Sequence, residues 1–254
     1  MIRASKYEAA ILDALNLRGR VTINELAGQL GVSGETARRH VEPLVKKGLA
    51  IRVHGGVTAP FSLHEAPFHR RLKKNRDAKR RLAKVAATLI EDGDSLIIDC
   101  GSTTAYVAQA LCDHSDLHVI TNSVEIARTL ASRNGNRVYV TGGELRADDA
   151  AAFGKVAVDF IQQFNVDYAV LSIGAVNKKN ELLDFYLCEA EFSRAAIQQA
   201  RQTCFVTDSS KFSKDALIKV CGLDQVDFVV TEGEPPTPFK KACTENDTRL
   251  LISN

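Results

Sequence analysis

The chain lacks the segments that direct a protein to a membrane or out of the cell. No stretch of its 254 residues approaches the roughly 20 consecutive apolar residues that span a bilayer. The N-terminus also has no basic segment followed by an apolar one, which a secretory signal requires. We therefore expect a cytoplasmic protein with no membrane partner. Internal repeats of the solenoid type are missing as well.

Close cysteine pairs are absent, although the chain has six cysteines. They lie at positions 100, 112, 188, 204, 221 and 243, mainly in apolar runs. Zinc and dithiol redox motifs need closer spacing, so we predict no metal and reduced thiols in the core. Cys100 alone lies beside a candidate ligand loop. The chain has neither a Walker loop nor a G-x-G-x-x-G motif, and no cofactor is predicted.

Charge is abundant but unevenly distributed. Residues 1–84 carry eighteen Lys and Arg against seven Asp and Glu, whereas residues 85–254 carry fifteen against twenty-four. The formal net charge of +2 therefore hides a basic first third and an acidic remainder. A basic region attracts the phosphates of nucleic acid through the release of counterions. The sequence predicts a small DNA-binding domain joined to a larger acidic one.

Residues 22–47 have the pattern of a helix-turn-helix. Thr22 and Glu25 form a potential capping box at the start of one helix, and Gly31 is placed to end it. Ser33 is the predicted N-cap of the next helix. Arg38 and Arg39 then fall in the early turns of that helix, where a recognition helix meets base edges and phosphates.

The segment from Leu49 to Val57 alternates apolar and basic residues and contains a glycine pair, which predicts a two-stranded wing. Two basic residues of this wing are expected to point at the phosphate backbone. The predicted DNA-binding residues of the helix and the wing are Ser33, Glu35, Thr36, Arg38, Arg39, His40, Arg52 and His54.

The strings TINELAGQLGVSGETARRHV and GLAIRVHGG resemble the DNA-binding domain of the DeoR family of bacterial transcription regulators. Two positions depart from the family pattern. His40 stands where the family usually has an aspartate, so a fixed acidic partner for the paired arginines is missing. Pro43 falls inside the recognition helix, where it removes a backbone donor, and we expect a kink or an early irregularity there.

Beyond a boundary that is rich in proline, strands and helices alternate. Strands are predicted at residues 95–99, 118–121, 137–141, 168–173, 203–207 and 228–231, and helices at 103–112, 124–132, 155–164 and 189–200. Such alternation indicates a mostly parallel sheet with helices on both faces. We predict a winged helix-turn-helix at 1–58, a linker at 59–75, and an α/β effector and oligomerisation domain at 76–254.

Small polar residues follow several of the predicted strands. Ligands of open parallel sheets bind at the carboxyl ends of the strands. The turn Asp99–Thr104 combines glycine, hydroxyls and a helix start, which together favour a phosphate. The segments 121–123, 142–144 and 208–211 follow later strands, and Lys211 offers a cation. Charged residues of nearby segments offer further contacts to hydroxyls or phosphate. The guanidinium of Arg146 is a bidentate donor, and carboxylates are acceptors. The acidic residues are Glu144, Asp148, Asp149, Asp184 and Glu189.

The same segments are similar to the effector domain of the DeoR family, whose fold resembles ribose-5-phosphate isomerase and which binds phosphorylated sugars or polyols. Among family branches, GGELRADD and TEGEPP look most similar to the one containing the glycerol-3-phosphate regulon repressor. The resemblance implies ligand roles for Asp99, Gly101, Ser102, Thr103, Thr104, Thr121, Asn122, Ser123, Gly142, Gly143 and Lys211.

Two functions are compatible with this reasoning. The first is a repressor that binds operator DNA as a homo-oligomer, dimer or tetramer, and is released by a phosphorylated sugar or polyol such as glycerol-3-phosphate. The alternative is a sugar-phosphate isomerase with a DNA-binding appendage, using Asp184, Glu189 or Glu191 as a base. The stretch NELLDFYLCEAEF lacks the glycine-rich segment that precedes the catalytic glutamate of the isomerases. We therefore predict a regulator and not an enzyme.

Overall fold

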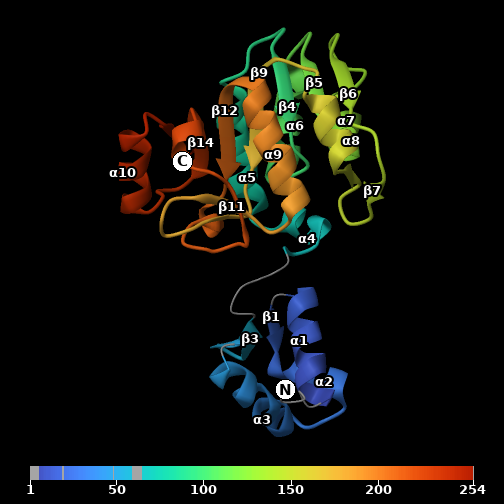
Figure 1. Cartoon of the computed structure of the whole chain (residues 1–254), viewed down its shortest axis with the longest axis vertical. Coiled ribbons are helices and arrows are strands. Elements are labelled where there is room, and N and C mark those ends of the chain that lie inside the picture. Colours follow the sequence, from blue (N-terminus) through green and yellow to red (C-terminus); the bar gives the residue numbers. More distant parts are fainter. Residues whose placement is uncertain (1–5, 19, 48, 59–64, 254) are drawn as a thin grey trace. The chain divides into compact units, whose positions relative to one another are not determined.

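The computed structural model describes residues 6–18, 20–47, 49–58 and 65–253 (Figure 1). The chain divides into two units, residues 1–66 and 67–254. Part of the expected linker, residues 59–64, lies outside the described residues. Its last part is not a linker, because helix α4 (Phe68–Lys73) begins just after the division, and Leu72 packs against the core of the second unit.

The first unit contains three helices and a small sheet. Helices α1 (Lys6–Arg18), α2 (Ile23–Leu30) and α3 (Gly34–Lys46) enclose one apolar core, in which Leu26, Val41 and Leu44 are almost fully buried. Strands β2 (Ile51–Val53) and β3 (Gly56–Thr58) form the predicted wing. Strand β1 (Arg20–Thr22) extends it by pairing with β3, so β3 is central.

The turn between α2 and α3 forms as predicted. The backbone N–H of Thr22 donates to Glu25 at 2.8 Å, and the N–H of Glu25 donates to the Thr22 hydroxyl at 3.2 Å, which completes the capping box. Gly31 ends α2 with a φ of 65°, a conformation that glycine adopts without steric cost. Ser33 caps α3 by accepting from the N–H of Thr36 at 3.2 Å.

Pro43 does not interrupt the recognition helix. Helix α3 continues to Lys46, and the N–H of Lys47 donates to the Pro43 carbonyl at 3.0 Å. The early irregularity that we expected at Pro43 is therefore not observed. Pro43 lies near the end of the helix, where its side chain is half-buried and only three helical residues follow it.

The second unit is built on a seven-stranded sheet in the order β15-β14-β12-β9-β4-β5-β6, in which all neighbouring strands are parallel. The strands are β4 (Ser95–Ile98), β5 (His118–Thr121), β6 (Arg137–Val140), β9 (Val166–Ser172), β12 (Ala200–Thr207), β14 (Phe228–Glu232) and β15 (Arg249–Ser253). The predicted fold class, a winged helix-turn-helix followed by a mostly parallel sheet, is confirmed.

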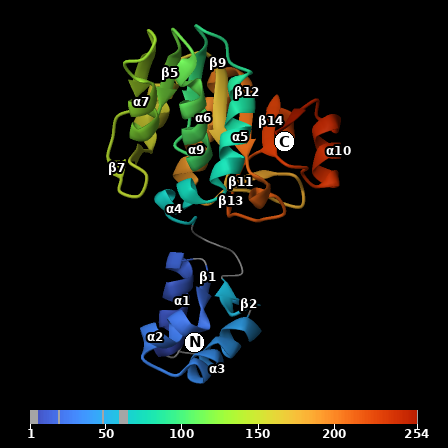
Figure 2. The same ribbon diagram turned by 180° about the vertical axis from the view of Figure 1, so that it is seen from behind.

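Helices cover both faces of this sheet (Figures 1 and 2). Helices α5 (Arg76–Ala87), α6 (Ser102–Ala110) and α7 (Val124–Leu130) pack on one face, against side chains such as Ile98 and Val206. Helices α8 (Lys155–Ile161), α9 (Leu187–Gln199) and α10 (Thr237–Glu245) pack on the other, against Ile97 and Phe205. Alternate residues of one strand thus enter opposite cores.

Several short elements were not predicted. Strands β10 (Ala175–Val176), β11 (Leu182–Asp184) and β13 (Ile218–Cys221) form a small antiparallel sheet, and β7 (Leu145–Arg146) pairs with β8 (Ala151–Ala152) in a hairpin. Helices α1, α4 and α10 and strand β15 were also missed. Strands of two or three residues are too short for a periodic pattern.

The order of the strands locates the switch point of the sheet. From β4 the chain proceeds outward through β5 to β6, and it then returns to the other side of β4 at β9. The chain therefore continues from β4 to a strand on one side of this pair and from β9 to a strand on the other side. In open α/β sheets, the crevice beyond such a pair of strand ends is the usual place for a ligand.

Candidate nucleic-acid interface and ligand site

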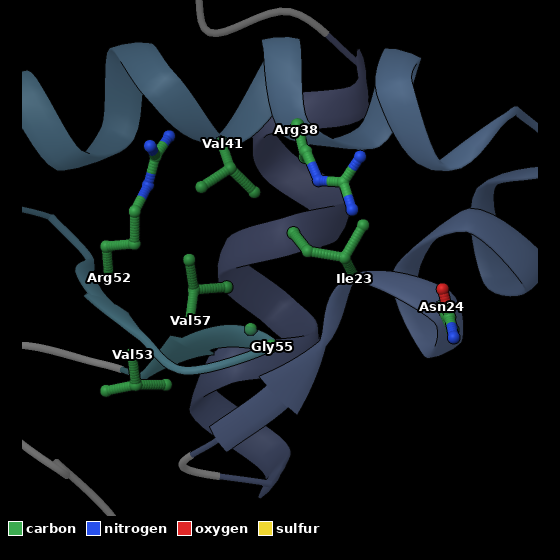
Figure 3. A pocket seen from close by; sticks show the side chains of 9 residues that line it. Ile23, Asn24, Arg38, Val41, Arg52, Val53, Gly55 and Val57 are labelled. Carbon is green, nitrogen blue, oxygen red and sulfur yellow. The ribbon is translucent and has the colours of Figure 1, made fainter.

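The recognition helix and the wing enclose two adjoining cavities in the first unit. Figure 3 shows the first, where Arg38 of α3 and Arg52 of β2 lie on either side of Val41. Its other lining residues are Ile23, Asn24, Val53, Gly55, Gly56 and Val57. The second cavity is lined by Glu35, Thr36, Arg38, Arg39, Glu42 and Arg52. The two cavities share Arg38 and Arg52, so the helix and the wing contribute to one continuous face.

Two of the three arginines on this face form ion pairs with carboxylates of α3. Arg38 donates to Glu35 at 3.2 Å, and Arg52 donates to Glu42 at 2.6 Å. Within the described ranges, Arg39 has no ion pair. All three guanidinium groups belong to exposed residues, as a nucleic-acid contact requires. The wing therefore contacts the recognition helix through a charged pair as well as through the core.

His40 has an aromatic neighbour in its own unit. Its ring contacts that of Tyr7 of α1, with the ring centroids 4.6 Å apart. The His40 side chain is half-buried there, and its contact with DNA stays a prediction. Ser33 and Thr36 use their polar groups to cap α3, with their hydroxyls 3.0 Å apart. His54 is exposed in the turn of the wing, as predicted.

In the second unit, the β4–α6 turn is held together by Asp99. Its carboxylate accepts from the hydroxyl of Thr104 at 2.6 Å, from the N–H of Gly101 at 3.2 Å, and from the N–H and hydroxyl of Ser172 at 2.9 and 2.8 Å. Burial raises the pKa of Asp99, and these hydrogen bonds partly oppose that rise. Asp99 and Thr104 therefore shape the turn and join the ends of β4 and β9 at the switch point.

Gly101 approaches the neighbouring strand so closely that a larger residue does not fit. A Cβ atom added to it would lie 1.9 Å from the Ser172 hydroxyl oxygen and 2.5 Å from the Ser172 Cβ. Gly101 is the N-cap of α6 and provides no side-chain cap. The first amides of α6 thus open onto a turn made of backbone and hydroxyl groups, which is the geometry that an anion favours.

Lys79 is a residue of this region that sequence reasoning missed. It lies on α5, is only 3% exposed, and donates to the Ser102 hydroxyl at 2.9 Å and to the Arg71 carbonyl at 2.6 Å. Its cation therefore lies next to the start of α6. The sequence offered no signal, because Lys79 belongs to a basic stretch whose other members are mostly exposed.

Polar side chains also follow β5 and β6. The Ser123 hydroxyl caps α7 by accepting from the N–H of Ile126 at 3.3 Å, and Thr121 accepts from the N–H of Ser123 at 3.1 Å. The amide nitrogen of Asn122 donates to the Ala152 carbonyl at 3.1 Å. In the described part of the chain, the buried Asn122 Oδ1 and Thr141 Oγ1 have no hydrogen-bond partner. Asn122 and Thr141 therefore each have a buried oxygen that can accept a hydrogen bond from a ligand.

Arg146 is the centre of a charged cluster that includes two of the predicted acidic residues. Its guanidinium pairs with Asp149 and with Glu189, the latter at 2.5 Å. It also lies 4.3 Å from the ring centroid of Phe153 and 5.3 Å from that of Tyr186. Burial lowers the pKa of Arg146, but the two carboxylates outweigh it and the pKa is raised. The arginine therefore remains charged.

Cys100 lies beside this cluster, with its sulfur 3.8 Å from an Asp149 oxygen. Burial, together with the charges of Glu189, Asp99 and Asp149, raises its pKa well above the usual value. A thiol in that environment does not ionise near neutral pH, so Cys100 does not have the properties of a reactive cysteine. All six cysteines are free thiols, as expected.

The remaining candidates lie farther along the strand ends. Gly142, Gly143 and Glu144 form an exposed loop after β6, whereas Lys211 ends a short turn (Ser209–Lys211) after β12. In the strand order, β6 and β12 lie on opposite sides of β4 and are four strand spacings apart, or about 19 Å. One phosphate therefore cannot contact both loops. Asp184 is buried at the end of β11 and accepts from the N–H of Phe185.

The described residues contain neither a cluster suited to a metal ion nor a helix suited to cross a membrane. Among the residues that the structure describes, no three His, Cys, Asp or Glu side chains are grouped so as to hold a metal ion. Over the same ranges, none of the helices has the length and apolar character needed to cross a membrane.

Comparison with known families gives matches to both units. A model of the DeoR-like helix-turn-helix domain matches residues 8–62, and a model of the DeoR C terminal sensor domain matches residues 74–233. Together they include both cavities of the first unit and the carboxyl ends of all the strands of the large sheet except β15.

Relatives match this chain over most or all of their length. The chain is 34% identical to the glycerol-3-phosphate regulon repressor of Escherichia coli (strain K12) over 251 residues, which cover 99% of this chain and 100% of that protein. It is 32% identical to the HTH-type transcriptional repressor CsqR of the same strain, over 92% of this chain and 90% of the relative.

Solved structures are more distant. Ribose 5-phosphate isomerase A from Methanocaldococcus jannaschii is 20% identical, covers 55% of each chain and has a TM-score of 0.39. The strand order and the family matches define the fold of this chain.

Proposed function

The chain belongs to the DeoR family of transcription regulators, and from that premise we propose that it represses genes by binding operator DNA and is released by a phosphorylated sugar or polyol. The premise also separates the two functions that the sequence left open. The chain is a regulator and not an isomerase, because two relatives that match it over nine-tenths or more of their length, the glycerol-3-phosphate regulon repressor and CsqR, are named as repressors.

The observation that carries the proposal is the joint placement of Arg38, Arg39 and Arg52 on one face formed by α3 and the wing. A recognition helix of this kind reads base edges in the major groove, while a wing contacts phosphates. We assign base contacts to Arg38 and Arg39, and phosphate contacts to Arg52 and His54. The first unit, residues 1–66, carries nine Lys and Arg against six Asp and Glu, and this positive surplus also favours a polyanion.

For the effector we propose a site at the switch point, beyond the ends of β4 and β9. The first turn of α6, with Ser102 and Thr103, would bind the phosphate, since free amides at a helix start attract anions. Asn122 and Arg146 are proposed to contact the hydroxyl groups. Glycerol-3-phosphate is the first ligand to test, because a repressor of the glycerol-3-phosphate regulon is 34% identical over the full length.

A homo-oligomer is part of the proposal. One winged helix has a small footprint on DNA, and specific binding at physiological salt usually requires two half-sites that are read together. We propose that the second unit joins the subunits and that the effector changes how they present their DNA-binding units. A ligand can do this only if it binds one arrangement more tightly than the other.

Helix α4 is suited to transmit that change, because it follows the division between the units and is bonded to elements of the ligand site. The N–H of Phe68 donates to Asp148 at 2.9 Å, in the hairpin that also contains Arg146. The hydroxyl of Tyr106 on α6 donates to the Leu72 carbonyl at 2.9 Å. A shift of the hairpin or of α6 would therefore reach α4 directly.

A direct experiment tests the effector class. Purified protein is titrated by calorimetry with glycerol-3-phosphate, a panel of sugar phosphates and the unphosphorylated parent compounds, and operator release is measured in parallel with a DNA fragment selected by the protein. We expect one phosphorylated compound to bind and to release the DNA. Equal affinity for glycerol and its phosphate would contradict the anion site.

Replacing Asp148 with Ala tests transmission through α4. The side chain accepts from the N–H of Phe68, whereas Arg146 pairs with the neighbouring Asp149 and with Glu189. We expect the variant to bind the effector found in the panel with unchanged affinity but to release DNA at a higher effector concentration, or not at all. If effector affinity falls in parallel with release, Asp148 is a ligand contact and the assignment is wrong.

A further inference from the structure

The DNA-binding face contains a carboxylate where a phosphate would be expected to bind. Glu42 of α3 and Arg52 of β2 line the same cavity, and their oxygen and nitrogen atoms are 2.6 Å apart. The side chains are 48% and 59% exposed, so both are accessible to a ligand. The residue proposed to contact DNA phosphate is thus already paired in the unbound protein.

The pair differs from the other one on this face in what it connects. Arg38 and Glu35 lie three residues apart on the same helix, so their contact requires no particular position of the wing. Arg52 lies on the edge strand of the three-stranded sheet, and its contact with Glu42 joins the wing to the recognition helix. Binding of a phosphate to Arg52 must therefore displace a carboxylate that belongs to the recognition helix.

We propose that Glu42 is an internal competitor for DNA phosphate and thereby limits the affinity of this protein for any duplex. Every duplex has the phosphate that must displace Glu42, so the competition weakens binding to all sequences equally. Only a sequence that also satisfies the base contacts of α3 compensates for that loss. Glu42 therefore keeps the sequence-independent part of the affinity low, so that stable binding requires the base contacts. This inference rests on the proposed DNA-binding face.

The magnitude of the effect follows from the exposure of the pair. Ion pairs between exposed side chains change equilibria by about 1.4- to fivefold. Because Arg52 contacts phosphate once Glu42 is displaced, the number of phosphate contacts is the same with and without the Glu42 charge. The slope of log K against log salt, which depends on that number, should therefore change little.

The test uses the full chain, with Glu42→Gln as the variant and a 30-base-pair duplex of random sequence as the probe, so no knowledge of the operator is needed. Affinity is measured by fluorescence anisotropy over a series of salt concentrations. We expect Glu42→Gln to bind random DNA about two- to fivefold more tightly, with a similar salt slope.

Two controls separate this role from a simple change in net charge. Glu8→Gln removes the same charge from the Glu8–Lys47 pair, whose residues line neither cavity, and should leave the affinity nearly unchanged. In an Arg52→Ala background, Glu42→Gln should have no further effect. Equal tightening in Glu8→Gln, or tightening that persists without Arg52, would overturn the proposal.

The outcomes also distinguish this inference from the proposed function. If neither Arg39→Ala nor Arg52→Ala changes DNA binding, the proposed face itself is wrong. If those variants weaken binding but Glu42→Gln does not tighten it, only the role of Glu42 is wrong. If Glu42→Gln weakens operator binding, the carboxylate accepts from a base, and competition with phosphate is excluded.

Discussion

Replacing Arg39 with Ala is expected to reduce operator affinity about 5- to 150-fold, a loss of about 1–3 kcal/mol, while binding to random DNA changes far less. Arg39 lies on the exposed face of α3 and, within the described residues, forms no ion pair. It is therefore available for a bidentate contact with a base, and one such contact discriminates by that amount. Titration of operator and random duplexes over a range of salt concentrations measures both affinities.

Arg52→Ala is the matched control for this prediction, because it removes the same functional group from the wing. A phosphate contact has no sequence preference, so Arg52→Ala should weaken binding to both duplexes by a similar factor and flatten the salt dependence. Unchanged operator specificity in Arg39→Ala would remove this residue from the base-reading set. A sequence-specific loss in Arg52→Ala would place the wing in a groove.

Replacing Gly101 with Ala is expected to abolish the response to the effector while operator binding is retained. The new methyl group would lie 1.9 Å from the Ser172 hydroxyl oxygen, so the ends of β4 and β9 must separate and the hydrogen bonds to Asp99 must change. Overpacking of this kind costs about 1–3 kcal/mol and distorts the turn that begins α6. A reporter gene should remain repressed when the effector is supplied.

A second substitution tests the steric reason for that loss. Ser172→Gly removes both atoms that the methyl group would meet most closely, so the double variant should recover part of the effector response. Gly28→Ala is a matched control, because its added methyl group has no neighbour within 4 Å, and it should behave as the wild type. If Gly101→Ala responds normally, the close approach at the switch point is not required for the response.

Local patterns predicted the first unit well. The caps at Thr22, Gly31 and Ser33 and the glycine pair of the wing act through neighbours within a few residues, so the sequence contains everything that they need. His40 was assigned to the DNA-binding face because of its position next to Arg39. Its aromatic neighbour, Tyr7, lies on another helix, which no local pattern reveals.

In the second unit, six of the seven strands of the large sheet and helices α6 to α9 were predicted, whereas β15, α10 and the strands of the smaller sheets were not. Strand β5, for example, has the predicted bounds, because three consecutive β-branched residues, Val119 to Thr121, end at the polar Asn122. Helix α4 was assigned to the linker because Pro67 precedes a run of basic residues. Proline also occurs at the start of helices, and here the helix begins directly after it.

The sequence by itself determined the two-unit plan, the helix-turn-helix and the strand ends that carry polar residues, because these depend on periodicity, capping and charge. Only the tertiary structure decided which strand ends are neighbours, since that depends on the return of the chain from β6 to β9. That return brings Ser172 to Asp99 and Glu189 to Arg146, and the packing of α5 brings Lys79 to Ser102. These pairs are separated by 23 to 73 residues, and contacts at such distances depend on the packing of the whole sheet and its helices.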